Sequence, residues 1–205
     1  MENKVLFRNF IKKYTKLISA EGDTKYAEKS SKYYKQLGLN AIVKNIPENE
    51  QYLHVYNLLN RYKPDILVIT GHDGMIKNGS NYNDIYNYRN SRHFIRTVRE
   101  ARRWGRTGEE LVIFAGACQS YYEAIMSAGS DFASSPARIL IDFLDPLIVA
   151  KKIATTESCK YVTMKDIAPE LKDGNKGIGG IRTLGKRKFR IWLWKKLMET
   201  HRENN

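Results

Sequence analysis

Two segments of the chain decide its fold: Ile66-Leu67-Val68-Ile69-Thr70-Gly71-His72-Asp73-Gly74 and Leu111-Val112-Ile113-Phe114-Ala115-Gly116-Ala117-Cys118-Gln119-Ser120. Each is a run of large, mostly β-branched apolar residues that stops at small residues and then presents one reactive side chain. Apolar runs of this length are typical of buried strands in a parallel sheet. The stretch between them has room for one loop and one crossover helix, so we expect the two strands to be neighbours in the sheet.

Patterns on either side of these two strands predict the remaining elements. Helical spacing of apolar residues, with Gly38 as a C-cap and Pro146 in a first turn, predicts helices at residues 4–19, 24–37, 47–62, 91–104, 119–128, from 145 onward, and 188–200. Further strands are predicted at residues 40–46, 137–143 and 160–163. The glycine-rich stretch 173–185 predicts a mobile loop. Strands that alternate with helices favour an α/β fold, with a mostly parallel sheet flanked by helices on both faces.

Composition sets the class of protein. The chain has 205 residues, which suits a single domain over residues 1–205, and a formal net charge of +13. Basic residues concentrate in a C-terminal segment, about residues 173–205, which we interpret as a solvated or partner-binding tail rather than a nucleic-acid site. No apolar run approaches the roughly 20 residues that span a bilayer, and the N-terminus does not resemble a secretion signal. Two cysteines without framework spacing argue against a disulfide scaffold and favour an intracellular protein.

The two reactive side chains predict a nucleophile pair. His72 and Cys118 each follow a strand of the predicted sheet, and working groups of open α/β sheets lie just beyond the carboxyl ends of their strands. A histidine across the strand ends, and the N-terminus of a helix starting at Gln119, would both favour the Cys118 thiolate. Small residues around Cys118 and at Gly74 leave room for a substrate carbonyl to approach backbone N–H groups, as acyl transfer requires.

Each of these residues also has a purely structural interpretation. A single cysteine at a strand end is usually a core residue, and a single histidine is usually a satisfied loop residue. Cys159 is interpreted as structural, and His54 and His93 as surface or packing residues of helices. The scattered histidines and cysteines lack the paired spacing of a zinc site, and the Gly177-Ile178-Gly179-Gly180 run lacks the preceding strand of a nucleotide motif. We therefore expect neither a metal nor a cofactor.

The sequence resembles the YabG family of sporulation-specific cysteine proteases. The similarity covers about residues 62–187 and is carried by Gly71–Gly74, Asn87–Ser91, Phe114–Ser120 and Asp131–Pro136. The same strand ends also resemble the wider caspase, gingipain, legumain and separase group. That resemblance implies a caspase-like fold with His72 as acid/base, Cys118 as nucleophile, and backbone N–H groups at Cys118 and Gly74 as oxyanion donors. The wider group usually has glycine directly after the histidine, whereas Asp73 intervenes here before Gly74.

The resemblance also implies a substrate class. It implies cleavage after arginine in spore coat and germination proteins, and an arginine pocket needs a carboxylate. The candidates by position are Asp73, Asp84, Asp131, Asp142 and Asp145, and for each of them a surface or capping role is the alternative. We favour Asp142 or Asp145, because both follow the strand predicted after the one that bears Cys118, although Asp145 before Pro146 also reads as an N-cap.

Further expectations concern the whole protein. The family carries a segment before its protease part, so the chain is expected to be a fragment or a shorter member. It is expected in the cytoplasm of the sporulating cell, associated with the developing coat, and self-cleavage is expected around Arg182, Lys186 and Arg187. Two alternatives stay open: a basic coat or nucleic-acid-binding protein with an inactive Cys–His pair, and another thiol acyl-transfer enzyme such as an amidase.

Overall fold

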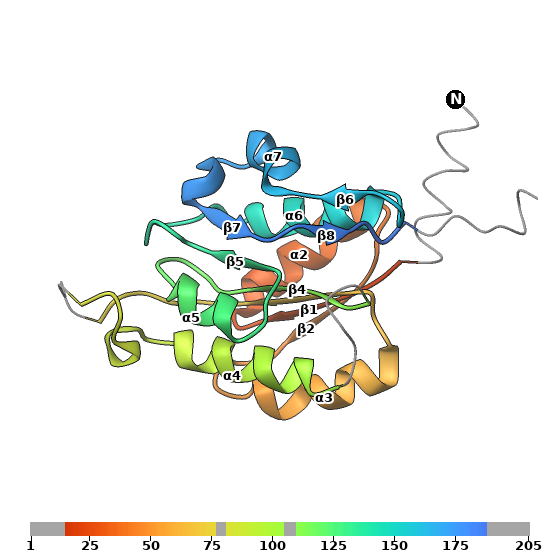
Figure 1. Ribbon diagram of the computed structural model, residues 1–205. Coiled ribbons are helices and arrows are strands. Elements are labelled where there is room, and N and C mark those ends of the chain that lie inside the picture. Colours follow the sequence, from red (N-terminus) through yellow and green to blue (C-terminus); the bar gives the residue numbers. More distant parts are fainter. Residues whose placement is uncertain (1–14, 77–80, 105–109, 188–205) are drawn as a thin grey trace, which may run out of the picture.

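The central feature of the computed structural model, which describes residues 15–76, 81–104 and 110–187, is a six-stranded sheet (Figure 1). Its strands lie in the order β2-β1-β3-β4-β5-β7. Their bounds are β1 (Lys16–Glu21), β2 (Asn40–Asn45), β3 (Ile66–Thr70), β4 (Val112–Ala115), β5 (Phe132–Ser134) and β7 (Ile178–Gly180). All neighbouring pairs are parallel except β5 and β7. The predicted α/β fold is confirmed, and β3 and β4 are neighbours as expected.

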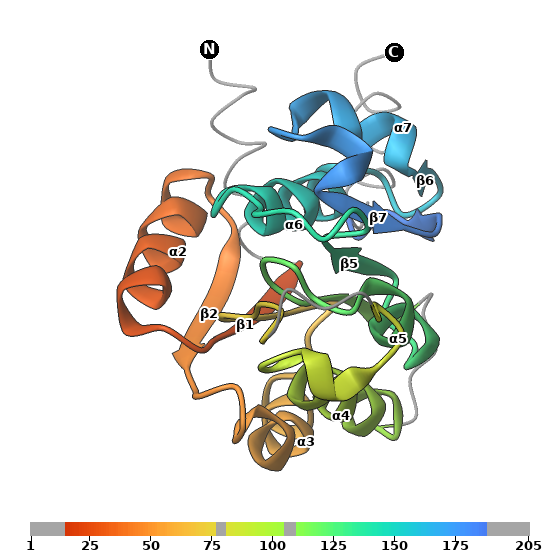
Figure 2. The same cartoon turned by 90° about the vertical axis from the view of Figure 1, so that its left-hand side faces the viewer.

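Helices cover both faces of this sheet (Figures 1 and 2). One face carries α2 (Thr24–Gln36), α6 (Asp145–Thr155) and the short α7 (Met164–Ile167). The other face carries α3 (Gln51–Tyr62), α4 (Ser91–Arg102) and α5 (Tyr122–Ser127). Alternate residues of each strand point to opposite faces, so the buried side chains form two apolar clusters, one on each side of the sheet.

Strand β1 corrects the N-terminal prediction. Residues 16–19, which were expected to end a helix, belong to this strand, and residues 4–14 lie outside the described residues. Leu17, Ser19 and Glu21 face α2 and α6, whereas Ile18 packs into the opposite cluster. The helical spacing was misleading because a short strand flanked on both sides by β2 and β3 gains its hydrogen bonds from partners distant in sequence.

The fourth strand was also misplaced. Residues 137–143 were expected to form it, but the strand is β5, which lies before that stretch. Residues 137–143 form irregular structure that lies near the ends of the central strands, where the Gln119 amide donates to Ile139 O at 3.0 Å. Three residues of strand are too few to show a period in the sequence, so pairing with β4 and β7 decided the outcome.

The glycine-rich stretch 173–185 is ordered rather than a mobile loop. It contains β7 and the strand β8 (Thr183–Leu184), which pairs with β6 (Tyr161–Val162) in a second, two-stranded sheet. A Cβ at Gly180 would lie 2.2 Å from Cδ1 of Phe132 and 2.7 Å from Asp131 O. Glycine is needed there because β7 approaches β5 closely. The short strand predicted near residues 160–163 is confirmed as β6.

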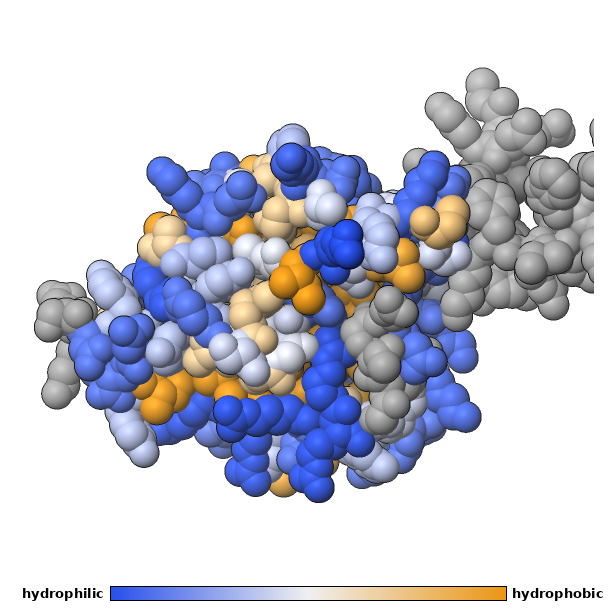
Figure 3. All heavy atoms as spheres, viewed as in Figure 1, coloured by the Kyte–Doolittle hydropathy of each residue, from blue (hydrophilic) through white to orange (hydrophobic). Residues whose placement is uncertain are grey.

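Most helix predictions are confirmed, with shifted ends. Helices α2, α4 and α6 lie where expected, and Gly38, with φ +70°, follows α2 as its C-cap glycine. Helix α3 begins at Gln51 rather than at Pro47, and α5 begins at Tyr122 rather than at Gln119. Three arginines of α4, Arg92, Arg96 and Arg99, are exposed, and so is Arg103, which follows the helix. Hydrophilic side chains cover the lower edge of Figure 3, where α3 and α4 lie.

Two expectations concern termini and membranes. The helix predicted at residues 188–200 lies outside the described residues. Within the part of the chain that the structure describes, no helix has the length and apolar character needed to cross a bilayer.

Candidate active site

A small pocket lies at the carboxyl ends of β1, β3 and β4, on the side of the sheet that α2 and α6 cover. Its volume is about 90 Å³. Strand-end residues form its base, and residues before and within α6, together with Tyr26 of α2, form its walls; the lining residues are Glu21, Tyr26, Thr70, Gly71, His72, Gly116, Ala117, Cys118, Ile141, Asp142, Phe143, Pro146 and Leu147. His72 and Cys118 therefore line the same pocket, from neighbouring strands. Figure 2 views the molecule from the carboxyl ends of these strands.

Cys118 lies in a tight turn after β4. The turn is held by Ala117 N–H, which donates to Ser120 Oγ at 2.9 Å, and begins at Gly116, whose φ of +108° suits glycine. The helix expected to start at Gln119 starts three residues later, and Gln119 itself has a φ of +53°. The Cys118 thiol thus sits on a turn rather than at a helix N-terminus. Its own amide donates to no acceptor among the described residues.

His72 is held by two carboxylates that the sequence did not point to. Its Nε2 lies 3.2 Å from Asp23 Oδ2, and its amide donates to Glu48 Oε1 at 2.6 Å. The edge of the Tyr26 ring packs against the imidazole, with 5.8 Å between ring centroids. The imidazole is still 56% exposed, so it is fixed on one side and accessible on the other. No hydrogen bond joins it to Cys118 within the described structure, a common state of catalytic groups without substrate.

Asp73 connects the two loops. Its Oδ1 accepts from the Gly74 and Asn90 amides at 2.9 and 2.8 Å, and its Oδ2 accepts from Ser120 Oγ at 2.9 Å and from Ser91 Oγ. Burial raises the pKa of this carboxyl, while these four donors lower it. Because the Gly74 N–H is already engaged with Asp73, this arrangement leaves Gly74 without a free donor for an oxyanion.

The acids expected to form an arginine pocket are scattered. Asp142 lines the pocket, although its Oδ1 accepts from Leu144 N at 2.9 Å. Asp145 is buried outside the lining, where it accepts from the Asp142 and Lys172 amides at 3.2 and 3.3 Å. Neither acid ends a strand, because the strand predicted at residues 137–143 is absent.

The other two candidates lie away from the pocket. Asp131 directly precedes β5, at the amino end of that strand, whereas the pocket lies at the carboxyl ends of the strands. It forms a partly buried ion pair with Arg102 at 2.6 Å. Asp84 caps a single 3-10 turn (Ile85–Asn87) by accepting from Tyr86 N at 2.9 Å. Both carboxylates thus have structural partners.

Sequence reasoning missed Glu21 and Asp23, which flank Gly22 at the end of β1. Asp23 is the N-cap of α2, where its Oδ1 accepts from Tyr26 N at 3.0 Å. An aspartate directly before a helix is a recognisable capping signal, but its second oxygen contacts His72 only because β1 and β3 are neighbours. Glu21 was missed because residues 16–19 of its strand were predicted to end a helix.

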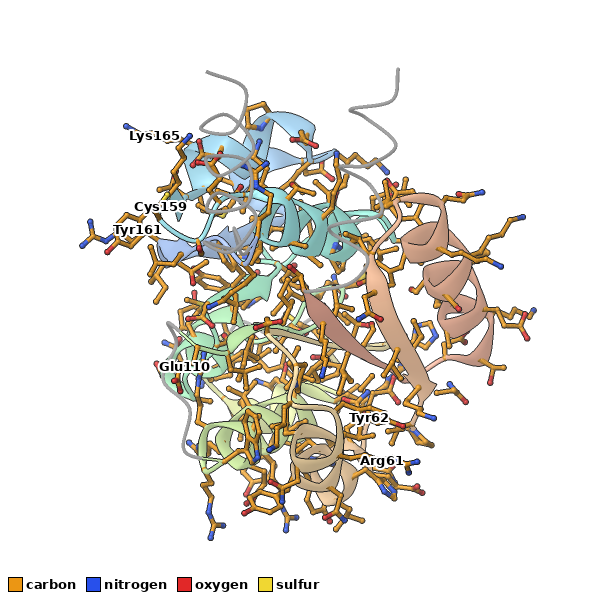
Figure 4. All side chains as sticks on the ribbon, turned by 90° about the vertical axis from the view of Figure 1, so that its right-hand side faces the viewer. Arg61, Tyr62, Glu110, Cys159, Tyr161 and Lys165 are labelled. Carbon is orange, nitrogen blue, oxygen red and sulfur yellow. The ribbon has the colours of Figure 1, made fainter. Side chains whose placement is uncertain are left out.

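Cys159, His54 and His93 lie outside this pocket. Cys159 is exposed at the periphery, near Tyr161 and on the side of the molecule opposite to that of Figure 2 (Figure 4). His54 is exposed on α3, and half-buried His93 lies on α4, where burial and then Arg92 lower the pKa of its imidazole. The described residues contain no group of three or more histidines, cysteines and acids that could hold a metal ion.

Comparison with known proteins identifies relatives. The model of the family described as YabG peptidase U57 matches residues 3–191. The sporulation-specific protease YabG of Bacillus subtilis (strain 168) is 39% identical over 170 residues, which are 83% of this chain, and the chain spans only 59% of the length of that relative. Among solved structures, the response regulator RcsB of Salmonella typhimurium is similar over 68% of this chain and 57% of its own, with 12% identity and a TM-score of 0.41, values that support no conclusion about function.

Proposed function

The chain belongs to the YabG peptidase family, and from this membership we propose that it is a cysteine endopeptidase of sporulation that cleaves after arginine. Its substrates would be spore coat and germination proteins, and it would act in the sporulating cell at the developing coat. The observation that carries the proposal is that Cys118 and His72, from the ends of neighbouring strands, line one pocket. A nucleophile and a base facing the same cavity is the arrangement that acyl transfer needs.

In the proposed reaction, Cys118 Sγ attacks the carbonyl carbon of the scissile peptide bond. The imidazole of His72 takes the thiol proton and delivers it to the departing amine, leaving a thioester on Cys118. Water then attacks the thioester with His72 as base, which releases the acid product and restores the thiol. Since Asp23 holds Nε2, the opposite ring nitrogen, Nδ1, is the one that would exchange the proton.

The Cys118 amide would supply oxyanion stabilisation, because it has no acceptor among the described residues and belongs to the nucleophile itself. Glycine at 116 keeps the turn compact: a Cβ there would meet the Ile125 and Ser134 side chains at 3.3 Å. Gly74 does not take part in this version of the site. The proposal also includes a caspase-like arrangement, which the positions of His72 and Cys118 at the ends of two neighbouring strands support.

Self-cleavage, if it follows the same specificity, would use Arg182. This residue is exposed and lies over the Tyr161 ring at 4.6 Å. By contrast, Lys186 is buried, and Arg187 pairs with Glu157, so cleavage at either would first require local unfolding. Of the three residues expected as self-cleavage sites, only Arg182 therefore remains in the proposal.

The test is cleavage of a peptide panel with Arg, Lys, Ala or Asp before the scissile bond, by the full chain and by Cys118→Ala. We expect cleavage after Arg that the variant lacks, and a Cys159→Ser control that keeps full activity. Cleavage that survives in Cys118→Ala would exclude Cys118 as nucleophile. Absence of cleavage together with salt-dependent DNA binding would favour a binding protein. Hydrolysis of small amides alone would favour an amidase.

A further inference from the structure

One buried acid in the pocket has no part in the proposed chemistry. Glu21, the last residue of β1, is 4% exposed and lines the pocket together with His72 and Cys118. Its side chain points to the same face of the sheet as Thr70, its register partner on β3. A carboxylate at the base of a pocket that also holds the nucleophile is positioned to contact whatever side chain enters.

The groups that donate hydrogen bonds to Glu21 are neutral hydroxyls. Its Oε1 accepts from Ser19 Oγ at 2.9 Å and from Ser30 Oγ at 3.1 Å, and its Oε2 accepts from the Thr70 hydroxyl. No lysine, arginine or histidine of the described residues forms an ion pair with it. Because a carboxylate offers about four acceptor positions, three hydroxyl donors leave one position on Oε2 unused.

A buried carboxylate without a cation is unfavourable unless something compensates it. Burial raises the pKa of Glu21, the nearby Asp23 charge adds to the rise, and the hydroxyls of Thr70, Ser19 and Ser30 oppose it. Buried Tyr34 also neighbours this acid, which raises the pKa of the phenol after burial itself does. The hydroxyls hold the carboxylate in place, but none of them neutralises it.

We propose that Glu21 is the specificity residue of the site, which binds the guanidinium of an arginine side chain before the scissile bond. The inference rests on the proposed function. Among the acids that line the pocket, Glu21 is the more buried, and Asp142 already accepts from Leu144 N. An arginine guanidinium suits such a site because it stays charged and is less strongly hydrated than an ammonium.

The walls of the pocket fit the rest of an arginine side chain. Tyr26 and Phe143 stack with ring centroids 5.5 Å apart, and both line the cavity with Leu147 and Ile141. Apolar walls cover the methylene stem of an arginine while its charged end reaches the base.

The test compares matched peptides that carry arginine or citrulline at the recognition position, since citrulline has nearly the same shape without the charge. With the full chain, kcat/KM is expected to favour arginine strongly. In Glu21→Gln the arginine-to-citrulline ratio should fall by at least about 30-fold, the loss that follows removal of one partner of a buried charge pair. The matched variant Asp142→Asn should change the ratio by less than about 5-fold. An unchanged ratio in Glu21→Gln, or loss of the preference in Asp142→Asn alone, would overturn the assignment.

A second readout does not depend on turnover. A peptide amide ending in arginine should slow alkylation of Cys118 by iodoacetamide, measured by mass, and its citrulline counterpart should not. Glu21→Gln should lose this protection while keeping the unprotected alkylation rate of the parent and a cooperative thermal unfolding transition, which shows that the variant is folded. Protection without peptide cleavage would support Glu21 and contradict the proposed function. Equal protection by the two peptide amides would contradict Glu21, whatever the outcome of the cleavage assay.

Discussion

The carboxylate of Asp73 accepts a hydrogen bond from Ser120 Oγ at 2.9 Å, and this contact joins the loop after β3 to the loop after β4. Ser120 Oγ in turn accepts from Ala117 N at 2.9 Å, so one hydroxyl connects Asp73 to the turn that presents Cys118. Asp73, the residue directly after His72, therefore links the loop that carries His72 to the turn that carries Cys118.

Replacing Asp73 with Asn should lower both stability and activity. An amide has one acceptor oxygen. Its NH₂ group would face donors whose hydrogen bonds the carboxylate now accepts. We expect a loss of about 2–4 kcal/mol in unfolding free energy, from buried groups left without partners, measured by urea denaturation. Ser120→Ala removes one of the four donors to Asp73 and also the acceptor of Ala117 N–H, and should cost about 1–3 kcal/mol. Equal stability of Asp73→Asn and the parent would show that the network contributes little.

Asp23 should orient His72 independently of its capping role. Asparagine caps helices about as well as aspartate, so Asp23→Asn should keep α2 intact but remove the charge beside Nε2. We expect kcat to fall by about tenfold or more, as expected for a hydrogen bond to a charged group, with an unchanged melting temperature. Asp23→Ala should lose the same activity and, in addition, about 1 kcal/mol of stability. If Asp23→Asn retained full kcat, Asp23 would act only as the N-cap of α2, and its contact with His72 would not contribute to catalysis.

The buried Glu21 carboxyl should make stability fall as pH rises. Its pKa is raised by burial in the folded protein, so between the ordinary value of 4.5 and the raised value the folded state holds a proton that the unfolded state has lost. In that window the unfolding free energy decreases with pH, with a limiting slope of about 1.4 kcal/mol per unit for one group. Glu21→Gln should lack this component, so the difference between the two unfolding curves isolates it. A difference that stayed constant with pH would show that Glu21 titrates at its ordinary value.

The ion pair of Asp131 and Arg102 should matter for stability and not for specificity. Arg102 also donates to Gly129 O and Leu111 O, both at 2.7 Å, so the pair fastens the start of β5. Asp131→Asn should cost about 3–5 kcal/mol in thermal or urea unfolding, because it leaves a partly buried charge unpaired. Cleavage by the folded fraction should keep its preference for arginine. The half-buried Asp84 offers the comparison, since Asp84→Asn preserves a capping side chain and should change neither property.

The sequence predicted those elements whose signal lies in consecutive residues. The runs at residues 66–70 and 111–115 are continuously apolar, which already indicates burial on both faces of a sheet, and both strands are confirmed. Helix α2, which Gly38 follows, and helix α4, whose apolar residues recur at helical spacing, were also predicted correctly. Short elements were not: β5 and β7 have three residues each and gain their structure from pairing.

The sequence by itself determined that His72 and Cys118 follow two strands of one parallel sheet, because a buried strand and its small-residue terminus are encoded in consecutive residues. Only the tertiary structure brought Glu21 and Asp23 to the same pocket, since β1 reaches β3 through pairing between residues far apart in the chain. The same holds for the acids: Asp131 and Asp145 differ from Glu21 in the partners that folding gives them, and partners across a sheet leave no mark in local sequence.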